Sequence, residues 1–273
     1  MNLYNLGRGA VQWLRYGSHA VQSFRAHLDD PHFARLSTGY IGPVQIASLR
    51  TGGASAADLM LRRHQRRFRH PQQRPAVYFP FLSASPFLPS DDPARILESQ
   101  VVAIRHEFRQ IEAQLHGHPE SWLVGAGRWD IFKLYRGGLR QDRQCALAPT
   151  TMQIVDQLPH CGAWLGMVYF SVLQPGTSIK PHCGLTNGRI RYHLGIEVAD
   201  DLAWIEVAGQ RRPWENGRCM VFDDSFCHRV EHRGTKRRVV LIVDLWHPEL
   251  LPDERRILVA SGLSRGFEAP FER

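Results

Sequence analysis

From Trp129 to Trp246 the chain alternates apolar and polar residues with a period of two, and this pattern constrains its fold more than any other feature. Residues two apart point to the same face of a strand, so such segments predict strands. Gly, Pro, Asn or Asp residues separate these segments, and no helical pattern intervenes. Many short strands with turn residues between them predict a sandwich or barrel, here a jelly roll. The predicted strands are Trp129–Tyr135, Met167–Leu173, Ile190–Val198, Ala203–Val207, Cys219–Phe222 and Val239–Trp246.

Two histidines and one arginine stand out in this β-rich region. His182 and His228 are far apart in the sequence, and Arg238 follows His228 by ten residues at the head of an apolar strand. This spacing is typical of a non-haem Fe(II) oxygenase, in which two imidazoles and usually a carboxylate bind one face of the metal. The carboxylate commonly lies two residues after the first histidine, on the same face of the strand. Here that position is Gly184, so the usual carboxylate is missing.

A series of short motifs recurs in fixed order over this region, in Phe170–Thr177, Pro181–Gly195, Trp214–His228 and Asp244–Leu250. Together they resemble the aspartyl/asparaginyl β-hydroxylase family, over about Trp129 to Leu250. The resemblance implies a 2-oxoglutarate-dependent hydroxylase built on a double-stranded β-helix. Animal members of the family also carry glycine at the position of Gly184, so the missing carboxylate agrees with the resemblance.

His182 and His228 are the predicted iron ligands and catalytic residues. We expect His182 to lie at the start of a strand with open space beside it, because a residue without a side chain follows at Gly184. His232 should leave the strand face and be exposed. Asp223 and Asp224 could supply a carboxylate ligand from outside the usual place, but we expect them to hold the turn before His228 or to orient an imidazole.

Four further residues are predicted to bind the cosubstrate. The planar guanidinium of Arg238 can pair with both oxygens of the distal carboxylate of 2-oxoglutarate. Ser171 could donate a supporting hydrogen bond. Arg191 and His193 lie on the same face of one predicted strand, and the resemblance implies that they hold the oxoacid or a carboxylate of the substrate. The predicted cofactors are therefore Fe(II) and 2-oxoglutarate.

The region before the strands has helical and irregular patterns. Residues 3–28 carry apolar residues at helical spacing, which predicts a helix packed on the core, with an interfacial membrane helix as the alternative. A short extended piece is expected around 44–49, and a helix beginning near Ser55 leads into a basic run at 62–70. Residues 71–93 are rich in proline and should be irregular. Asp92 and Pro93 begin an amphipathic helix that reaches Leu115.

Length and composition support one catalytic domain with extensions. We predict a helical extension over residues 1–75, a double-stranded β-helix (jelly-roll or cupin-like) domain over 76–255, and a tail over 256–273, in a mainly β (α+β) fold with N-terminal helices packed on the core. Lys and Arg exceed Asp and Glu by 34 − 26 = 8. Much of this excess lies in the run 62–70, which reads as a solvated helical face with too few aromatic residues for a nucleic-acid site.

The cysteines indicate a reduced compartment. Five cysteines without a CxxC pair, no signal-peptide pattern and no apolar run long enough for a bilayer predict a cytoplasmic protein.

The predicted function is hydroxylation of the β-carbon of an aspartyl or asparaginyl unit, free, carrier-bound or within a peptide. One alternative is a lipid acyl-chain hydroxylase of the same superfamily, favoured if residues 1–30 contact membranes. The other is a non-catalytic cupin-like binding module, for which only the missing carboxylate argues. The sequence does not identify the substrate or the oligomeric state.

Overall fold

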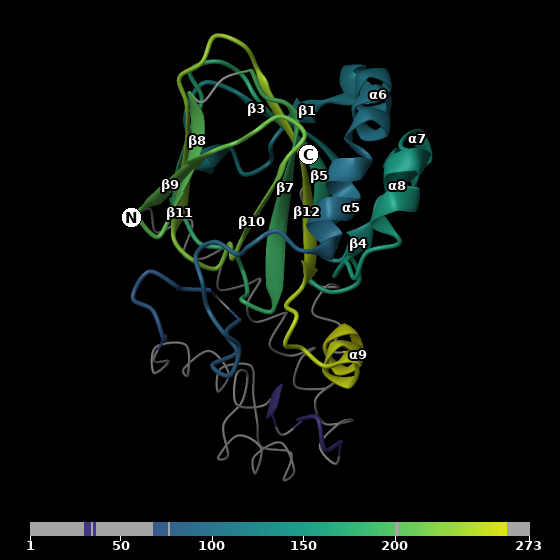
Figure 1. Ribbon diagram of the computed structural model, residues 1–273, viewed down its shortest axis with the longest axis vertical. Helices are drawn as coiled ribbons and strands as arrows, with labels where there is room; N and C mark the ends of the chain where they lie inside the picture. Colours follow the sequence, from purple (N-terminus) through teal and green to yellow (C-terminus); the bar gives the residue numbers. More distant parts are fainter. Residues whose placement is uncertain (1–29, 34, 37–67, 76, 200–201, 261–273) are drawn as a thin grey trace.

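The computed structural model describes residues 30–33, 35–36, 68–75, 77–199 and 202–260. Within these residues two antiparallel sheets face each other (Figure 1). The seven-stranded sheet has the order β1-β3-β5-β12-β7-β10, with β4 beside β3, and the five-stranded sheet has the order β2-β6-β11-β8-β9. The larger sheet comprises β1 (His116–Gly117), β3 (Trp129–Arg136), β4 (Leu139–Arg140), β5 (Val168–Leu173), β7 (Arg189–Glu197), β10 (Cys219–Phe222) and β12 (Arg238–Trp246). The smaller comprises β2 (Val124–Ala126), β6 (Ser178–His182), β8 (Ala203–Val207), β9 (Gln210–Pro213) and β11 (His228–His232).

From β5 to β12 the chain crosses repeatedly between the sheets. As a result, β5, β12, β7 and β10 form neighbouring strands of one sheet, and β6, β11, β8 and β9 form neighbouring strands of the other. This arrangement is a double-stranded β-helix, as the family resemblance implied, and it agrees with the jelly roll that the alternation of apolar residues predicted. The apolar residues of the inner faces, including Ile131, Ile205 and Val240, form one buried cluster between the sheets.

The six predicted strands are confirmed as β3, β5, β7, β8, β10 and β12, with ends that differ by one residue at most. The sequence did not predict β6, β9 and β11, which are short and rich in polar residues. Two details of the prediction were wrong. His182 is the last residue of β6 rather than the first of a strand. His232 is buried rather than exposed, because His228, Val230 and His232 alternate onto the same inner face of β11.

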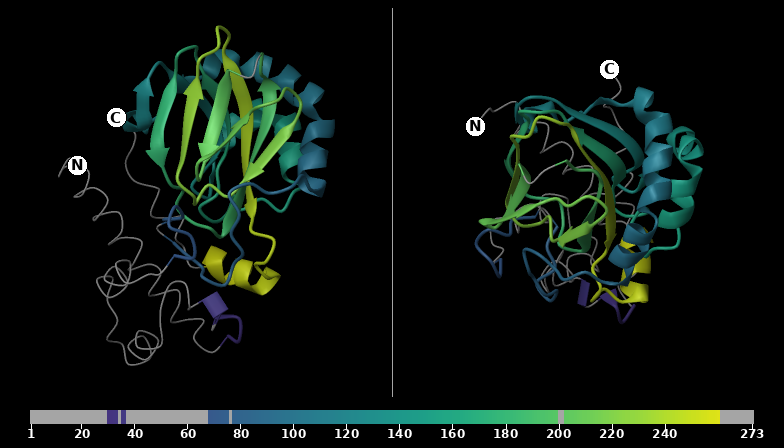
Figure 2. Two further views of the ribbon diagram at one scale, coloured as in Figure 1. Left: turned by 60° about the vertical axis from the view of Figure 1, so that its left-hand side comes forward. Right: turned by 45° about the horizontal axis from the view of Figure 1, so that its top comes forward.

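Helices cover the outer face of the larger sheet, as Figure 2 shows. The predicted helix from Asp92 is in fact two, α5 (Asp92–Ser99) and α6 (Val101–Ile111), followed by a short 3-10 turn, η2 (Glu112–Gln114). The chain breaks at Gln100, whose amide donates to the Leu97 carbonyl at 3.2 Å. The predicted apolar stripe nevertheless packs on the sheet, because Leu97, Ile104 and Phe108 belong to one buried cluster with strand residues.

The other helices within residues 68–260 were not predicted, and two of them lie between predicted strands, where the sequence showed no helical pattern. They are η3 (Ser121–Leu123), α7 (Asp142–Leu147), α8 (Pro149–Val155) and α9 (Pro252–Ala260). The segment 71–91 is irregular, as predicted, and Tyr78, Phe79 and Leu82 within it are buried. It follows the edge of the barrel through isolated bridges, Val77 to Thr186 and Phe87 to Phe222.

Several predictions fall outside the described residues. They are the helix at 3–28, the extended piece at 44–49, the helix beginning near Ser55 and most of the basic run. The described end of that run, 68–70, is not helical. No helix in the described part of the chain is both long and apolar enough to cross a membrane.

Candidate active site

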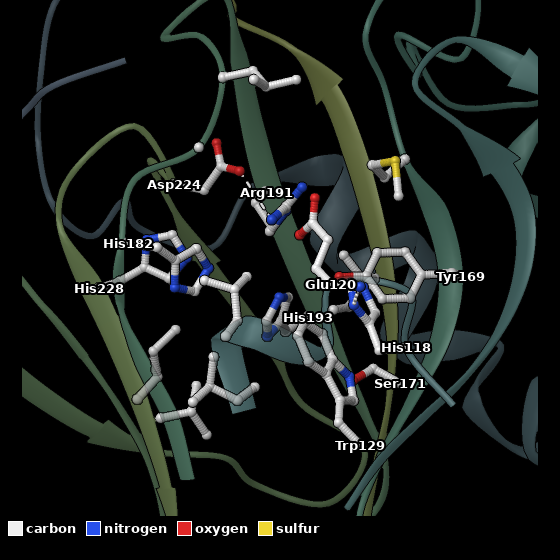
Figure 3. Close-up of a pocket in the computed structure, with 18 of the residues that line it drawn as sticks. His118, Glu120, Trp129, Tyr169, Ser171, His182, Arg191, His193, Asp224 and His228 are labelled. Carbon is white, nitrogen blue, oxygen red and sulfur yellow. Dashed lines mark hydrogen bonds and ion pairs between the residues drawn. The ribbon is translucent and has the colours of Figure 1, made fainter. Parts of the chain in front are cut away.

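A cavity of about 420 Å³ lies between the two sheets. His182 and His228 line it from the smaller sheet, whereas Ser171, Arg191, His193 and Arg238 line it from the larger one. Figure 3 shows the two histidines on one side of the cavity and Tyr169, Ser171 and Trp129 on the other. The fold therefore brings all six predicted site residues to a single cavity, and its size is that of a small-molecule site.

The two histidines are fixed by strand pairing. β6 and β11 are antiparallel, and His228 lies directly opposite His182, with the ring centroids 4.1 Å apart. Nδ1 of His182 lies 2.8 Å from the Lys180 carbonyl, and Nδ1 of His228 lies 2.8 Å from the Phe226 carbonyl. A carbonyl oxygen only accepts, so each Nδ1 must carry the proton and donate.

This tautomer leaves the Nε2 lone pair of both rings available to a metal ion. Burial also lowers the pKa of His182, and it lowers the pKa of His228 to about 3, so both rings are neutral at physiological pH. Across the described residues, no three His, Cys, Asp or Glu side chains group closely enough to bind a metal. His182 and His228 are thus two neutral imidazoles with neighbouring Nε2 lone pairs, and Gly184 supplies no third side chain.

The space beside Gly184 is filled, contrary to the expectation of open space. A Cβ added at Gly184 would lie 2.3 Å from Oδ2 of Asp224, far inside van der Waals contact. The amide of Gly184 also donates to the Asp224 carbonyl at 2.6 Å. Residue 184 therefore has no carboxylate of its own, but the carboxylate of Asp224 lies directly beside it. Asp224 belongs to the turn before β11.

Asp224 belongs to a buried network of two arginines and two aspartates. Its Oδ2 accepts from Arg189 and from Arg191, each at 2.9 Å. Asp244 accepts from Arg191 through both carboxylate oxygens, at 2.7 and 2.9 Å, and lies 3.0 Å from Arg189. Burial alone would raise the pKa of Asp224, but the two guanidinium groups lower it to about 2. The four charges balance, so neither arginine is a free cation.

Asp223 and Asp224 were predicted either to hold the turn before His228 or to orient an imidazole, and the hydrogen bonds distinguish between these roles. Both imidazoles are oriented by backbone carbonyls, so neither Asp223 nor Asp224 orients a histidine. Asp223 holds the turn, because its Oδ1 accepts from the Ser225 amide at 2.9 Å. Oδ1 of Asp224 is buried and has no partner.

Arg238 is a buried cation of a different kind. Only 3% of it is exposed, and its Nη1 donates to the carbonyl of Ser171 at 3.2 Å and contacts the hydroxyl at 3.4 Å. No carboxylate pairs with it in the described structure. Burial lowers its pKa to about 9, which leaves it charged at neutral pH. Its guanidinium carbon lies 4.5 Å from the centroid of the Trp214 ring, which stabilises the cation.

Trp214 also sets the tautomer of His193. The indole Nε1 donates to Nδ1 of His193 at 3.2 Å, so the proton of the neutral ring lies on Nε2. Burial holds the pKa of His193 well below its ordinary value, so the ring stays neutral. Its Nε2 is buried without a partner. Ser171 accepts from Nε1 of Trp129 at 2.9 Å, which leaves its own hydroxyl proton to donate.

Sequence reasoning missed the residues that support this site. Trp214 lies in a stretch of family resemblance but had no predicted role. Asp244 also had no predicted role, and the pattern of its strand does not reveal one. Trp129 was read only as a strand residue. Lys133 and His118 also line the cavity. Lys133 alternates with Trp129 and Ile131, and this period-two signal could have identified it.

The chain is similar in sequence to known proteins. A family model described as aspartyl/asparaginyl beta-hydroxylase matches residues 98–248. The chain is 39% identical over 135 residues to the Homo sapiens protein named aspartyl/asparaginyl beta-hydroxylase, covering 49% of this chain and 18% of that protein. It is 36% identical over 200 residues to the Rattus norvegicus aspartate beta-hydroxylase domain-containing protein 2, covering 68% of this chain and 58% of that protein. The chain thus spans less than two thirds of these relatives.

Among solved structures, the chain is similar to a prolyl-4-hydroxylase from Pseudomonas putida, with a TM-score of 0.37 and 17% identity, over 60% of this chain and 90% of that one. A likeness this slight adds nothing to the fold described above.

Proposed function

The chain belongs to the aspartyl/asparaginyl β-hydroxylase family, and on that basis we propose that it is an Fe(II)- and 2-oxoglutarate-dependent hydroxylase. We propose that its substrate contains an aspartyl or asparaginyl unit, free, carrier-bound or within a peptide, and that the β-carbon of this unit is hydroxylated. One observation supports this function above the rest. A single cavity contains an imidazole pair in the metal-binding tautomer and a buried guanidinium, that of Arg238, to which no described residue supplies a carboxylate partner.

His182 and His228 would hold iron through Nε2. Both rings are neutral and already fixed through Nδ1, so metal binding requires no deprotonation and little reorientation. The unpartnered Oδ1 of Asp224 lies at the turn beside them and can accept a hydrogen bond from a water or substrate group. When bound, iron together with 2-oxoglutarate supplies the activation of dioxygen.

Arg238, His193 and Ser171 would hold the distal carboxylate of 2-oxoglutarate. Arg238 provides the charge, the Nε2 proton of His193 provides a second donor, and the Ser171 hydroxyl provides a third. A bound carboxylate would pair a buried cation and satisfy a buried donor, both of which are costly to leave unpaired. Arg191 was predicted to join them, but its charge is already balanced by Asp224 and Asp244, so it contributes to the rigid wall of the cavity.

The histidine pair can be tested by measuring iron-dependent succinate release. His182→Ala and His228→Ala should each abolish turnover, because one imidazole alone cannot retain iron in a site that already lacks a third ligand. His106→Ala is the matched control, because His106 is exposed on α6 and lies outside the cavity. His232 is unsuitable as a control because it is buried. Succinate release that survives in His182→Ala would show that the iron site lies elsewhere.

A further inference from the structure

Lys133 is a buried lysine whose side chain faces the same cavity. On β3, Trp129, Ile131 and Lys133 alternate toward the space between the sheets, whereas Phe132 and Leu134 pack in the cluster beneath the helices. Lys133 lines the cavity and is only 9% exposed. The chain has three lysines and otherwise uses arginine for positive charge, so a lysine at this position is conspicuous.

The side chain of Lys133 makes no hydrogen bond or ion pair with any residue that the structure describes, whereas both arginines of the buried network have carboxylate partners. The carboxylate of Glu120, which also lines the cavity, attracts the ammonium at longer range, and the guanidinium of Arg136 repels it. Its neighbour His118 is stacked on Trp129 with centroids 3.6 Å apart, and burial lowers the pKa of His118 to about 3, so that ring is neutral. Burial lowers the pKa of Lys133 to about 8, which still leaves it mostly charged at neutral pH. An unpaired cation in a cavity is costly for folding and is typical of ligand sites.

Lys133 and Arg238 project from different positions along the larger sheet. Lys133 is paired with Tyr169 on β5, whereas Arg238 is paired with Leu173, four residues further along the same strand. That offset corresponds to about 13 Å along the strands, and β3 and β12 are separated by two strand spacings, about 10 Å. The backbone positions are thus farther apart than the two carboxylates of a five-carbon diacid. Lys133 and Arg238 are therefore separate cations of the cavity, and neither forms an ion pair with a carboxylate of the described residues.

We propose that Lys133 forms a second anion subsite, which binds a carboxylate of the substrate and makes the enzyme prefer acids over the corresponding amides. This inference rests on the proposed function and narrows its substrate class. Arg238 takes the oxoacid, and Lys133 takes the acidic group of the molecule to be hydroxylated. The acidic group is the side-chain carboxylate of an aspartyl unit, which carries a charge that the asparaginyl amide lacks.

The test compares acid and amide probes. An acetylated and amidated peptide with one Asp is compared with the same peptide carrying Asn, and free L-aspartate is compared with L-asparagine. Calorimetric titration gives the affinity of each probe, and succinate release with iron and 2-oxoglutarate gives its KM. Preference for the Asp peptide and for L-aspartate over their amides is the expected result. Binding of both free amino acids but neither peptide would show that the α-carboxylate is recognised instead and would overturn the proposal.

Lys133→Met should weaken binding and raise KM of the carboxylate probe by at least about tenfold, with a much smaller effect on KM for 2-oxoglutarate. Lys133→Arg should recover part of the loss, since it restores the charge. A merely structural lysine would give neither the split between the two KM values nor the rescue. Lys236→Met is the matched control, because Lys236 is exposed and lies outside the cavity.

Equal affinity of the wild type for acid and amide, binding of none of the probes, or unchanged affinity in Lys133→Met would each overturn the subsite. Failure of the proposed function gives a different result, namely no succinate from 2-oxoglutarate in the wild type. In that case the calorimetric arm still decides whether Lys133 binds a carboxylate.

Discussion

At the scale of single residues, unsatisfied polar atoms mark where ligands are expected. Nε2 of His193, Nε of Arg238 and Oδ1 of Asp224 are buried without partners, and all three residues line the same cavity. A buried polar group without a hydrogen bond costs about 1–3 kcal/mol, so its persistence calls for an explanation. Binding of a carboxylate between Arg238 and His193 would satisfy two of these groups at once.

Replacement of Arg238 tests that assignment. Arg238→Ala should raise KM for 2-oxoglutarate steeply, because loss of one partner of a buried charge pair costs about 2–5 kcal/mol. Arg238→Lys should recover only part, because an ammonium cannot pair with both carboxylate oxygens. Steady-state kinetics with varied 2-oxoglutarate measure both, with the exposed Arg95→Ala as control. An unchanged KM in both variants would move the oxoacid site elsewhere.

At the scale of elements, strand register builds the site. The pairing of β6 with β11 places His182 opposite His228, and the pairing of β7 with β12 places Arg191 opposite Asp244. The alternation of apolar residues predicted β7 and β12 because both are long and buried. It did not predict β6 or β11, whose few apolar residues give no clear pattern. Yet the alternation of His228, Val230 and His232 would have placed His232 inward had β11 been recognised.

The buried network that joins β7, β12 and the turn before β11 should contribute strongly to stability. Asp224→Asn should lower the free energy of unfolding by about 3–5 kcal/mol, because it leaves an uncompensated arginine charge in the core. Asp142→Asn is the control: its carboxylate is 89% exposed and pairs with Arg140, so the loss should be below about 1 kcal/mol. Urea unfolding of both variants at neutral pH measures the difference, and equal losses would contradict the account.

The same network predicts sensitivity to acid. The pKa of Asp224 falls from an ordinary value of 3.8 to about 2 in the folded protein, so the folded state binds its proton less readily than the unfolded state does. Its contribution to stability is therefore fully present above about pH 4 and is lost as the pH falls toward 2. In urea unfolding over this range, the wild type should lose more stability than Asp224→Asn, whereas parallel losses would contradict the assignment.

At the scale of the whole molecule, the sequence predicted the barrel and a set of site residues that the fold places together, but it missed how the cavity is completed. His182, His228, Ser171, Arg191, His193 and Arg238 all line one cavity, as predicted. The contact between Gly184 and Asp224 joins residues 40 positions apart, and no local periodicity encodes it. Likewise, the break at Gln100 preserves the apolar stripe across two helices, so the stripe alone could not reveal it.

The most direct test of the central claim is the stoichiometry of dioxygen consumed and succinate formed by the wild-type protein. With Fe(II) and 2-oxoglutarate present, the account predicts equal amounts of both. It also predicts that both are lost when a chelator removes the metal and recover when Fe(II) is restored. A protein that binds 2-oxoglutarate and metal but forms no succinate would contradict the account and favour a non-catalytic cupin-like binding module.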